Sequence, residues 1–232
     1  MAQIFHRSTN LISRFTIFGG IVFVAFLGWA LYTIALSPWY TRQDYTEQQP
    51  VPFSHRHHVG ELGIDCRYCH VTVEKSSFAG IPPTQTCMTC HSQIWTNADM
   101  LEPVRASYRD NTSLNWVRVN ALPDFVYFDH SIHINKGIGC TTCHGPIGEM
   151  PLTYRQGTLY MSWCLDCHRQ PEKNLRPQSE VFNAFYQQPS RNNPVTYDGL
   201  TYTDQLTLGR KLLADYKIHD TRFMQSCSTC HR

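Results

Sequence analysis

Five copies of one short pattern, Cys-x-x-Cys-His, contain every cysteine of this chain, and they occupy residues 66–70, 87–91, 140–144, 164–168 and 227–231. Two thiols three residues apart can each form a thioether bond to a vinyl group at one porphyrin edge, and the histidine that follows can bind the iron. The pattern therefore predicts five covalently bound haem c groups. The thioether-forming residues are Cys66, Cys69, Cys87, Cys90, Cys140, Cys143, Cys164, Cys167, Cys227 and Cys230.

The histidine that closes each motif is the predicted proximal iron ligand. Other uses of ten cysteines explain this histidine less well. A disulfide framework does not need a histidine after every second cysteine. Zinc sites made from Cys-x-x-Cys pairs would leave the same histidines without a role, and iron–sulfur clusters need four thiolates each. The predicted proximal ligands are His70, His91, His144, His168 and His231.

Two further histidines precede each pair of motifs in a repeated pattern, Phe-x-His-x-x-His, which begins at Phe53 and again at Phe128. The chain therefore contains two similar modules, residues 53–91 and 128–168, and a tail unit, residues 219–231, with one upstream histidine. Iron in a low-spin c-type haem needs a ligand on each face. The predicted distal ligands are His55, His58, His130, His133 and His219.

The assignment of distal ligands to irons is partly open at this stage. We expect His55 to serve the haem of the first motif and His130 that of the third, which leaves His58 and His133 for neighbouring haems. Methionine is the rival distal ligand, and it raises the reduction potential relative to histidine. The candidate methionines are Met150, Met161 and Met224.

Residues 15–36 contain no charged side chain. A helix of this length, at about 1.5 Å per residue, spans the roughly 30 Å hydrocarbon core of a bilayer. A cleaved signal peptide fits less well, because the apolar run is too long and Pro38 would hamper cleavage. Arg7 and Arg14 place the short N-terminal tail on the cytoplasmic side, with Trp39 and Tyr40 at the opposite interface.

The predicted organisation is therefore a cytoplasmic tail (1–14), a transmembrane helix (15–37) and an extracytoplasmic haem domain (38–232). The predicted location is the bacterial inner membrane, single-pass, with the haem domain on the periplasmic face, because covalent haem attachment takes place there. The formal net charge of +2 falls below zero once haem propionates are counted. No basic run indicates nucleic-acid binding.

The haem domain has only about 38 residues for each of its five motifs, too few to build an ordinary core around every haem. We therefore expect the haems themselves to form the core, wrapped by a mainly α-helical chain with much irregular loop. The 13 prolines and 13 glycines favour such a chain over a regular sheet or bundle. Two stretches without a motif, 94–123 and 171–215, are expected to cover the surface or dock partners.

The Phe-x-His-x-x-His lead resembles that of the class III cytochromes c, small low-potential proteins with several bis-histidine haems. The N-terminal anchor, the five motifs and two longer stretches resemble the pentahaem cytochrome subunit of bacterial alternative complex III. Those stretches are residues 128–145, from Phe-Asp-His-Ser-Ile-His to Cys-x-x-Cys-His-Gly, and 161–169, Met-Ser-Trp-Cys-Leu-Asp-Cys-His-Arg.

This resemblance implies an electron-transfer subunit, and not itself an enzyme, within a quinol-oxidising membrane complex. Its implied partners are polytopic membrane subunits, an iron–sulfur subunit, monohaem cytochromes and a downstream soluble cytochrome, copper protein or oxidase. The alternative is a stand-alone quinol dehydrogenase with a single span. A third possibility, a multihaem reductase, needs an iron with a vacant face, and no Cys-x-x-Cys-Lys motif occurs.

Overall fold

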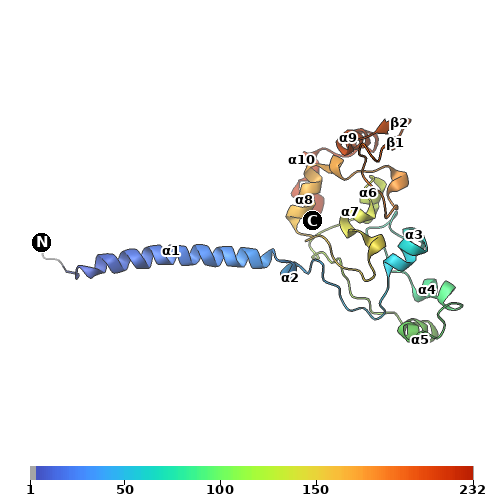
Figure 1. Ribbon diagram of the computed structural model, residues 1–232, viewed down its shortest axis with the longest axis horizontal. Coiled ribbons are helices and arrows are strands. Elements are labelled where there is room, and N and C mark those ends of the chain that lie inside the picture. The colour runs from blue at the N-terminus through green and yellow to red at the C-terminus, as the bar shows by residue number, and fades with distance from the viewer. Residues whose placement is uncertain (1–3, 232) are drawn as a thin grey trace. The chain divides into compact units, whose positions relative to one another are not determined.

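The computed structural model describes residues 4–231, and the chain divides into two compact units with a boundary between Tyr45 and Thr46 (Figure 1). The first unit contains α1 (Ser8–Ala35) and α2 (Pro38–Thr41). With 28 residues, none of them buried, α1 is long and apolar enough to cross a membrane. It begins before the predicted segment 15–37, because no proline or glycine interrupts the polar residues from Ser8 to Arg14.

The second unit consists mainly of short helices joined by irregular loops, as predicted. Each Cys-x-x-Cys pair lies in a helix of its own. A helix places residues i and i+3 on one face, so the two thiols of each motif point to the same side. These five helices are α3 (Cys66–Cys69), α4 (Thr84–His91), α7 (Cys140–His144), α8 (Met161–Arg169) and α11 (Cys227–Cys230).

The upstream histidines lie on two other short helices. His130 opens α6 (His130–Asn135), so His130 and His133 share an α-helix. His55 precedes η1 (Arg56–Glu61), a π-helix that contains His58. π-Helical turns are rare and occur often at functional sites. The remaining helices are η2 (Asp99–Leu101), α5 (Glu102–Asp110), η3 (Ile147–Glu149), η4 (Pro171–Lys173), η5 (Gln178–Glu180), α9 (Gln205–Asp215) and α10 (Thr221–Met224).

Aspartate side chains cap the N-termini of several of these helices. The Asp65 carboxylate accepts a hydrogen bond from the Arg67 backbone N–H, and Asp129 accepts one from Ser131, each at 2.8 Å. Asp204 caps α9 in the same way. Such caps satisfy backbone donors that a helix start leaves unpaired. The caps of α3 and α6 therefore fix one attachment motif and one pair of upstream histidines.

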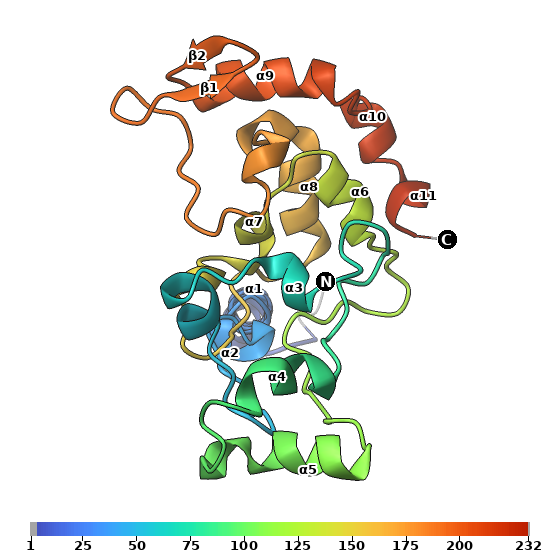
Figure 2. The ribbon, with the colours of Figure 1, turned by 90° about the vertical axis from the view of Figure 1, so that its right-hand side faces the viewer.

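The buried apolar side chains form three small clusters instead of one large core. The largest contains Ile138, Leu175, Tyr202, Leu208 and Leu212, and the others centre on Val104 and Val181. Most of the largest cluster comes from the stretch 171–215, which we expected to lie on the surface or dock partners. Its side chains instead pack, and α9 contacts η4 and β2 (Figure 2).

One two-stranded antiparallel sheet, β1 (Val195–Tyr197) and β2 (Leu200–Tyr202), was not anticipated from the sequence. Asp198 and Gly199 connect the strands with φ angles of 52° and 74°. Two consecutive residues in the left-handed region form the tight turn that an Asp-Gly pair favours in a hairpin. The hairpin adds Tyr202 to the largest apolar cluster.

Candidate haem sites

Three histidines that close motifs each face one upstream histidine. The ring centroids lie 6.2 Å apart for His58 and His91, 6.3 Å for His130 and His144, and 6.2 Å for His133 and His168. Two metal–nitrogen bonds of about 2 Å, plus about 1.1 Å from each nitrogen to its ring centre, give about 6.2 Å. Each pair therefore fits two imidazoles that bind a single iron from opposite faces.

Hydrogen bonds at Nδ1 orient most of the candidate ligands. A backbone carbonyl can only accept, so the Nδ1 atom that contacts it carries the proton and Nε2 keeps its lone pair for a metal. The contacts below are Nδ1 to carbonyl oxygen. They join His58 to Ser54 (2.8 Å), His70 to Gly80 (2.7 Å), His91 to Ile94 (3.3 Å), His130 to Ser77 (2.8 Å), His133 to Asp129 (2.7 Å), His168 to Met224 (2.9 Å) and His231 to Phe125 (3.0 Å).

Two candidate ligands contact side chains instead. Nδ1 of His55 lies 2.9 Å from the Thr153 hydroxyl, which can accept a hydrogen bond. Nδ1 of His144 lies 3.0 Å from the side-chain amide of Asn120, through the amide nitrogen. The amide oxygen and nitrogen occupy equivalent positions after a flip. Iron binding through Nε2 of His144 therefore requires Asn120 to present its oxygen.

The two modules repeat the same ring arrangement. Phe53 stacks on His58 at 4.4 Å between centroids and meets His55 edge-on at 4.9 Å. Phe128 stacks on His133 at 4.6 Å and meets His130 edge-on at 4.7 Å. The phenylalanine of each Phe-x-His-x-x-His lead thus wedges between its two histidines and fixes both rings. The repeat seen in the sequence is a repeat of geometry as well.

Burial keeps several of these imidazoles in the neutral form, which is the form that binds metal. Burial lowers the pKa of His55 to about 4, with further contributions from the imidazoles of His70, His144 and His58. Burial also lowers the pKa of His144 to about 4. The same cause lowers the pKa of His133.

No disulfide joins the ten cysteines, so both thiols of every motif are available for thioether bonds, and neighbouring motifs bring some of them close together. Burial raises the pKa of the Cys143 thiol to about 12. Cys66 and Cys140, from the first and third motifs, lie within hydrogen-bond reach of each other. Within residues 4–231 no group of three or more His, Cys, Asp and Glu side chains converges as a metal cluster. Six of the candidate histidines instead form the three pairs described above.

The remaining candidates are less closely paired. The rings of His55 and His70 are not in contact. After burial, the imidazole of His70 contributes most to the lowered pKa of His55. His219 is exposed and packs on Phe223, with ring centroids 4.3 Å apart. His57 was not predicted to bind iron. Its Nδ1 lies 2.8 Å from the Glu61 carboxylate, and its ring stacks on Trp95 and meets the His58 ring edge-on at 5.5 Å between centroids.

The three methionines considered as distal ligands differ in environment. Met150 is only 1% exposed, whereas Met161 is 61% exposed. Met224 offers its backbone carbonyl to His168. No described contact brings a methionine sulfur to a motif histidine.

Sequence reasoning missed the groups that hold the imidazoles at Nδ1. Most are backbone carbonyls, which carry no residue-type signal. Gly80 is an exception, because its φ of +80° suits glycine and places its carbonyl on His70. Asn120 lies in the motif-free stretch 94–123 and Thr153 lies between the third and fourth motifs, so no spacing rule points to either. Arg176, which contacts the third motif, was also missed.

Comparisons with known proteins identify the family of this chain. Residues 37–115, which include the first Phe-x-His-x-x-His lead and the first two motifs, match the model of the class III cytochrome c family. The chain is also 33% identical over 172 residues to the multiheme cytochrome c subunit of menaquinone reductase from Nitratidesulfovibrio vulgaris (strain Hildenborough). That match covers 65% of this chain and 79% of the relative. The chain therefore belongs to the class III cytochrome c family and is a multihaem cytochrome with covalently bound haem c.

Proposed function

We propose that the chain carries five haems, each bound by histidine on both faces, and relays electrons within a quinone-linked membrane complex. The three histidine pairs with centroid separations of 6.2–6.3 Å are the observation that carries this proposal. They support His58 as the distal ligand for the second motif, His130 for the third and His133 for the fourth. We further propose His55 for the first motif and His219 for the fifth.

Contacts between motifs support a spatial order that differs from the sequence order. The Tyr68 hydroxyl lies 2.8 Å from that of Thr89, so the first and second motifs touch. The first and third meet at Cys66 and Cys140. We propose that the haems are neighbours in the order second, first, third, fourth, fifth.

The links beyond the third motif use shared elements. Helix α6 carries both His130 and His133, so it joins the third haem to the fourth. The carbonyl of Met224, just before the fifth motif, holds His168 of the fourth. In addition, the Tyr127 backbone N–H donates to the Cys230 carbonyl at 2.9 Å, which seats the fifth motif beside the start of the second module.

When bound, each haem iron takes up and releases one electron without making or breaking a bond. The chain's own residues restrict it to this chemistry. Two imidazoles per iron leave no face for a substrate, and short Nδ1 hydrogen bonds keep the rings in place in both redox states. Close spacing of the motifs keeps neighbouring porphyrins near each other. These features favour a relay over a catalytic site.

We propose that α1 anchors the relay in the bacterial inner membrane, with residues 1–14 in the cytoplasm and residues 38–232 on the periplasmic face. The length and composition of α1 and the arginines before its apolar part support this topology. A single helix does not enclose a quinone pocket, which needs several convergent walls. Polytopic membrane subunits, an iron–sulfur subunit and monohaem cytochromes are the proposed partners.

The direction of flow is the finer part of the proposal. The relative from N. vulgaris is a subunit of a menaquinone reductase, whereas the resemblance to alternative complex III predicts quinol oxidation. A series of haem irons with both faces ligated can transfer electrons in either direction. The reduction potentials of its partners decide the direction. We propose flow from quinol toward a soluble cytochrome, copper protein or oxidase.

The test uses the full-length haem-loaded chain in liposomes with a menaquinol analogue and soluble cytochrome c as the acceptor. Alone, the chain should show little quinol oxidation, and the complete complex purified from its membrane should show rapid oxidation. Rapid turnover by the chain alone would support a stand-alone quinol dehydrogenase instead. A complex that only reduces menaquinone would reverse the proposed direction.

A further inference from the structure

Arg176 lies buried against the third attachment motif. Its side chain is only 6% exposed. Nη2 donates to the Thr141 hydroxyl at 2.9 Å and to the Thr142 hydroxyl at 3.4 Å. These two threonines are the residues between Cys140 and Cys143. The guanidinium therefore sits directly beside the place where the third haem is attached.

Among the described residues, Arg176 forms no ion pair at salt-bridge distance, although the more distant Glu180 carboxylate acts to raise its pKa. Nη1 donates to the backbone carbonyls of Glu180 at 3.5 Å and Asn183 at 3.3 Å, and the guanidinium carbon lies 4.6 Å from the centre of the Tyr186 ring. Nε is buried without a hydrogen-bond partner. Burial lowers the pKa of Arg176, yet arginine stays charged at neutral pH. Burying a cation without a close ion pair costs folding free energy. We therefore ask what function the Arg176 charge serves at this position.

Gly139 makes room for the Arg176 side chain, and Gly137 lies against the Arg176 backbone. Any side chain at Gly139 would overlap the Arg176 guanidinium. Gly137 has a φ of +82°, and its carbonyl accepts a hydrogen bond from the Arg176 backbone N–H at 2.9 Å. Both glycines lie within three residues of Cys140. The local backbone is thus shaped to admit a guanidinium next to the motif.

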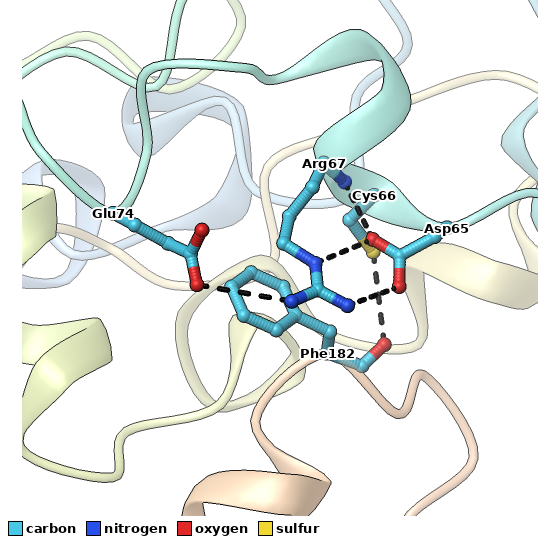
Figure 3. A network of polar contacts seen from close by, with 5 residues as sticks. All are labelled: Asp65, Cys66, Arg67, Glu74 and Phe182. Atoms are coloured by element: carbon cyan, nitrogen blue, oxygen red, sulfur yellow. Dashed lines mark hydrogen bonds and ion pairs between the residues drawn. The ribbon is translucent and has the colours of Figure 1, made fainter.

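Arg176 also braces a segment that touches two motifs. We call residues 180–183 the bridging segment. The Cys140 backbone N–H donates to the Val181 carbonyl at 3.4 Å, and the Cys66 thiol points to the Phe182 carbonyl at 3.7 Å. The Arg67 guanidinium, paired with Asp65, lies 4.5 Å over the Phe182 ring (Figure 3). The first and third motifs therefore meet on this segment.

We propose that Arg176 is a positioning residue that holds the first and third motifs together and raises the reduction potential of the haem on the third. The inference rests on the proposed relay function. When one electron passes from the first iron to the third, the first is oxidised, the third is reduced, and no bond changes. The receiving site becomes more negative by one charge. A nearby cation in a low-dielectric interior stabilises that state.

The test compares Arg176→Gln with Arg169→Gln in the full-length haem-loaded protein. Arg169 follows the fourth motif, but it is exposed and faces Asp166 at 3.6 Å, so solvent and its partner screen its charge. Redox titration followed by paramagnetic resonance resolves the individual haems. A His130→Met variant identifies the titration step of the third haem, because its distal ligand changes.

Arg176→Gln should lower the midpoint of the third-haem step by more than Arg169→Gln shifts any step. Arg176→Lys, which keeps the charge, should hold that midpoint within the shift of the control. The proposal is contradicted if five low-spin haems are present and the third-haem midpoint moves no further than in the control.

The two Arg176 variants also distinguish an effect on the reduction potential from a loss of haem caused by misfolding. If Arg176→Gln fails to retain haem, Arg176→Lys carries the test with the opposite criterion: a third-haem midpoint that moves further than in Arg169→Gln, although the charge is kept, would contradict the effect of the charge. Loss of haem from both variants, with five haems retained in Arg169→Gln, would show a purely structural role and contradict the effect on potential. Fewer than five low-spin haems in the unaltered protein would instead contradict the proposed function.

Discussion

At the residue scale, nine of the ten candidate ligands have their two ring nitrogens in different environments. Nδ1 lies within hydrogen-bond distance of a carbonyl, hydroxyl or amide group, which leaves Nε2 for the proposed bond to iron. The sequence could identify the histidines, because an attachment motif needs a partner ligand for its iron. It could not identify most of the groups that hold Nδ1, since these are backbone carbonyls brought close by the fold. Ser77, for example, contacts His130 from 53 residues away.

The adjacent histidines His57 and His58 offer a matched pair of substitutions. His58→Met should convert one bis-histidine centre to histidine–methionine ligation and raise its midpoint potential by on the order of 100 mV. His57→Met should leave the ligands of all five centres unchanged, because Nδ1 of His57 contacts Glu61 and its ring meets the His58 ring only at the edge. Paramagnetic resonance combined with a redox titration measures both. A change in ligation caused by His57→Met would show that the assignment is wrong.

Asn120 gives a second prediction at this scale. Asn120→Asp should place a stronger acceptor on Nδ1 of His144, make the ligand more electron-donating and lower the potential of one haem. Asn120→Ala should raise that potential. Asn111→Asp is the control, because it adds the same charge at an exposed helix end. Spectroelectrochemical titration measures the shifts. Equal shifts in Asn120→Asp and Asn111→Asp would refute a specific contact with the ligand.

At the scale of elements, α6 carries two of the proposed distal ligands, His130 and His133, on a helix of only six residues. So short a helix depends on its cap, and Asp129 supplies it. Asp129→Ala should lower the free energy of unfolding by about 0.5–2 kcal/mol and weaken ligation by both His130 and His133. Guanidinium denaturation followed at the Soret band measures the first effect, and paramagnetic resonance the second.

Asp204→Ala is the matched control, because Asp204 caps α9 and α9 carries no predicted ligand. It should reduce stability while leaving every low-spin signal intact. If Asp204→Ala disturbed ligation as strongly as Asp129→Ala, the special role of α6 would be refuted.

The helices that carry haem-binding residues could be predicted, because the chemistry of haem binding fixes the spacing of those residues. Elements that depend on packing between distant parts of the chain could not be predicted. The spacing of Phe128, His130 and His133 indicated a helix, and α6 is one. The same spacing after Phe53 gives the π-helix η1, because the choice between helix types lies in its long-range contacts. The Asp198-Gly199 pair is typical of a hairpin turn, so the sequence does contain a local indication of β1 and β2. The bridging segment gave no local signal at all.

At the scale of the whole molecule, small apolar clusters and many irregular loops suit a domain that wraps several haems. The sequence predicted this from the ratio of residues to motifs, and the three separate clusters agree with it. The spatial order of the motifs could not be predicted from the sequence alone. The first and third motifs meet through residues more than 70 positions apart in the sequence, and only the folded chain brings them together.

The proposed topology predicts a simple fractionation result. In the proposed topology α1 crosses the bilayer, so the full-length chain should stay in the membrane pellet after a carbonate wash. Protease added to spheroplasts should digest the haem domain, which is proposed to lie on the outer face. Release by carbonate, or protection of the haem domain until the membrane is permeabilised, would contradict the single-span topology.

The central claim is that every attachment motif carries an iron closed on both faces. Quantitative paramagnetic resonance of the fully oxidised, full-length protein tests this claim most directly, because it counts low-spin and high-spin ferric centres per chain. The account predicts five low-spin centres and no high-spin signal. Fewer than five, or a high-spin centre in the native protein, would contradict it.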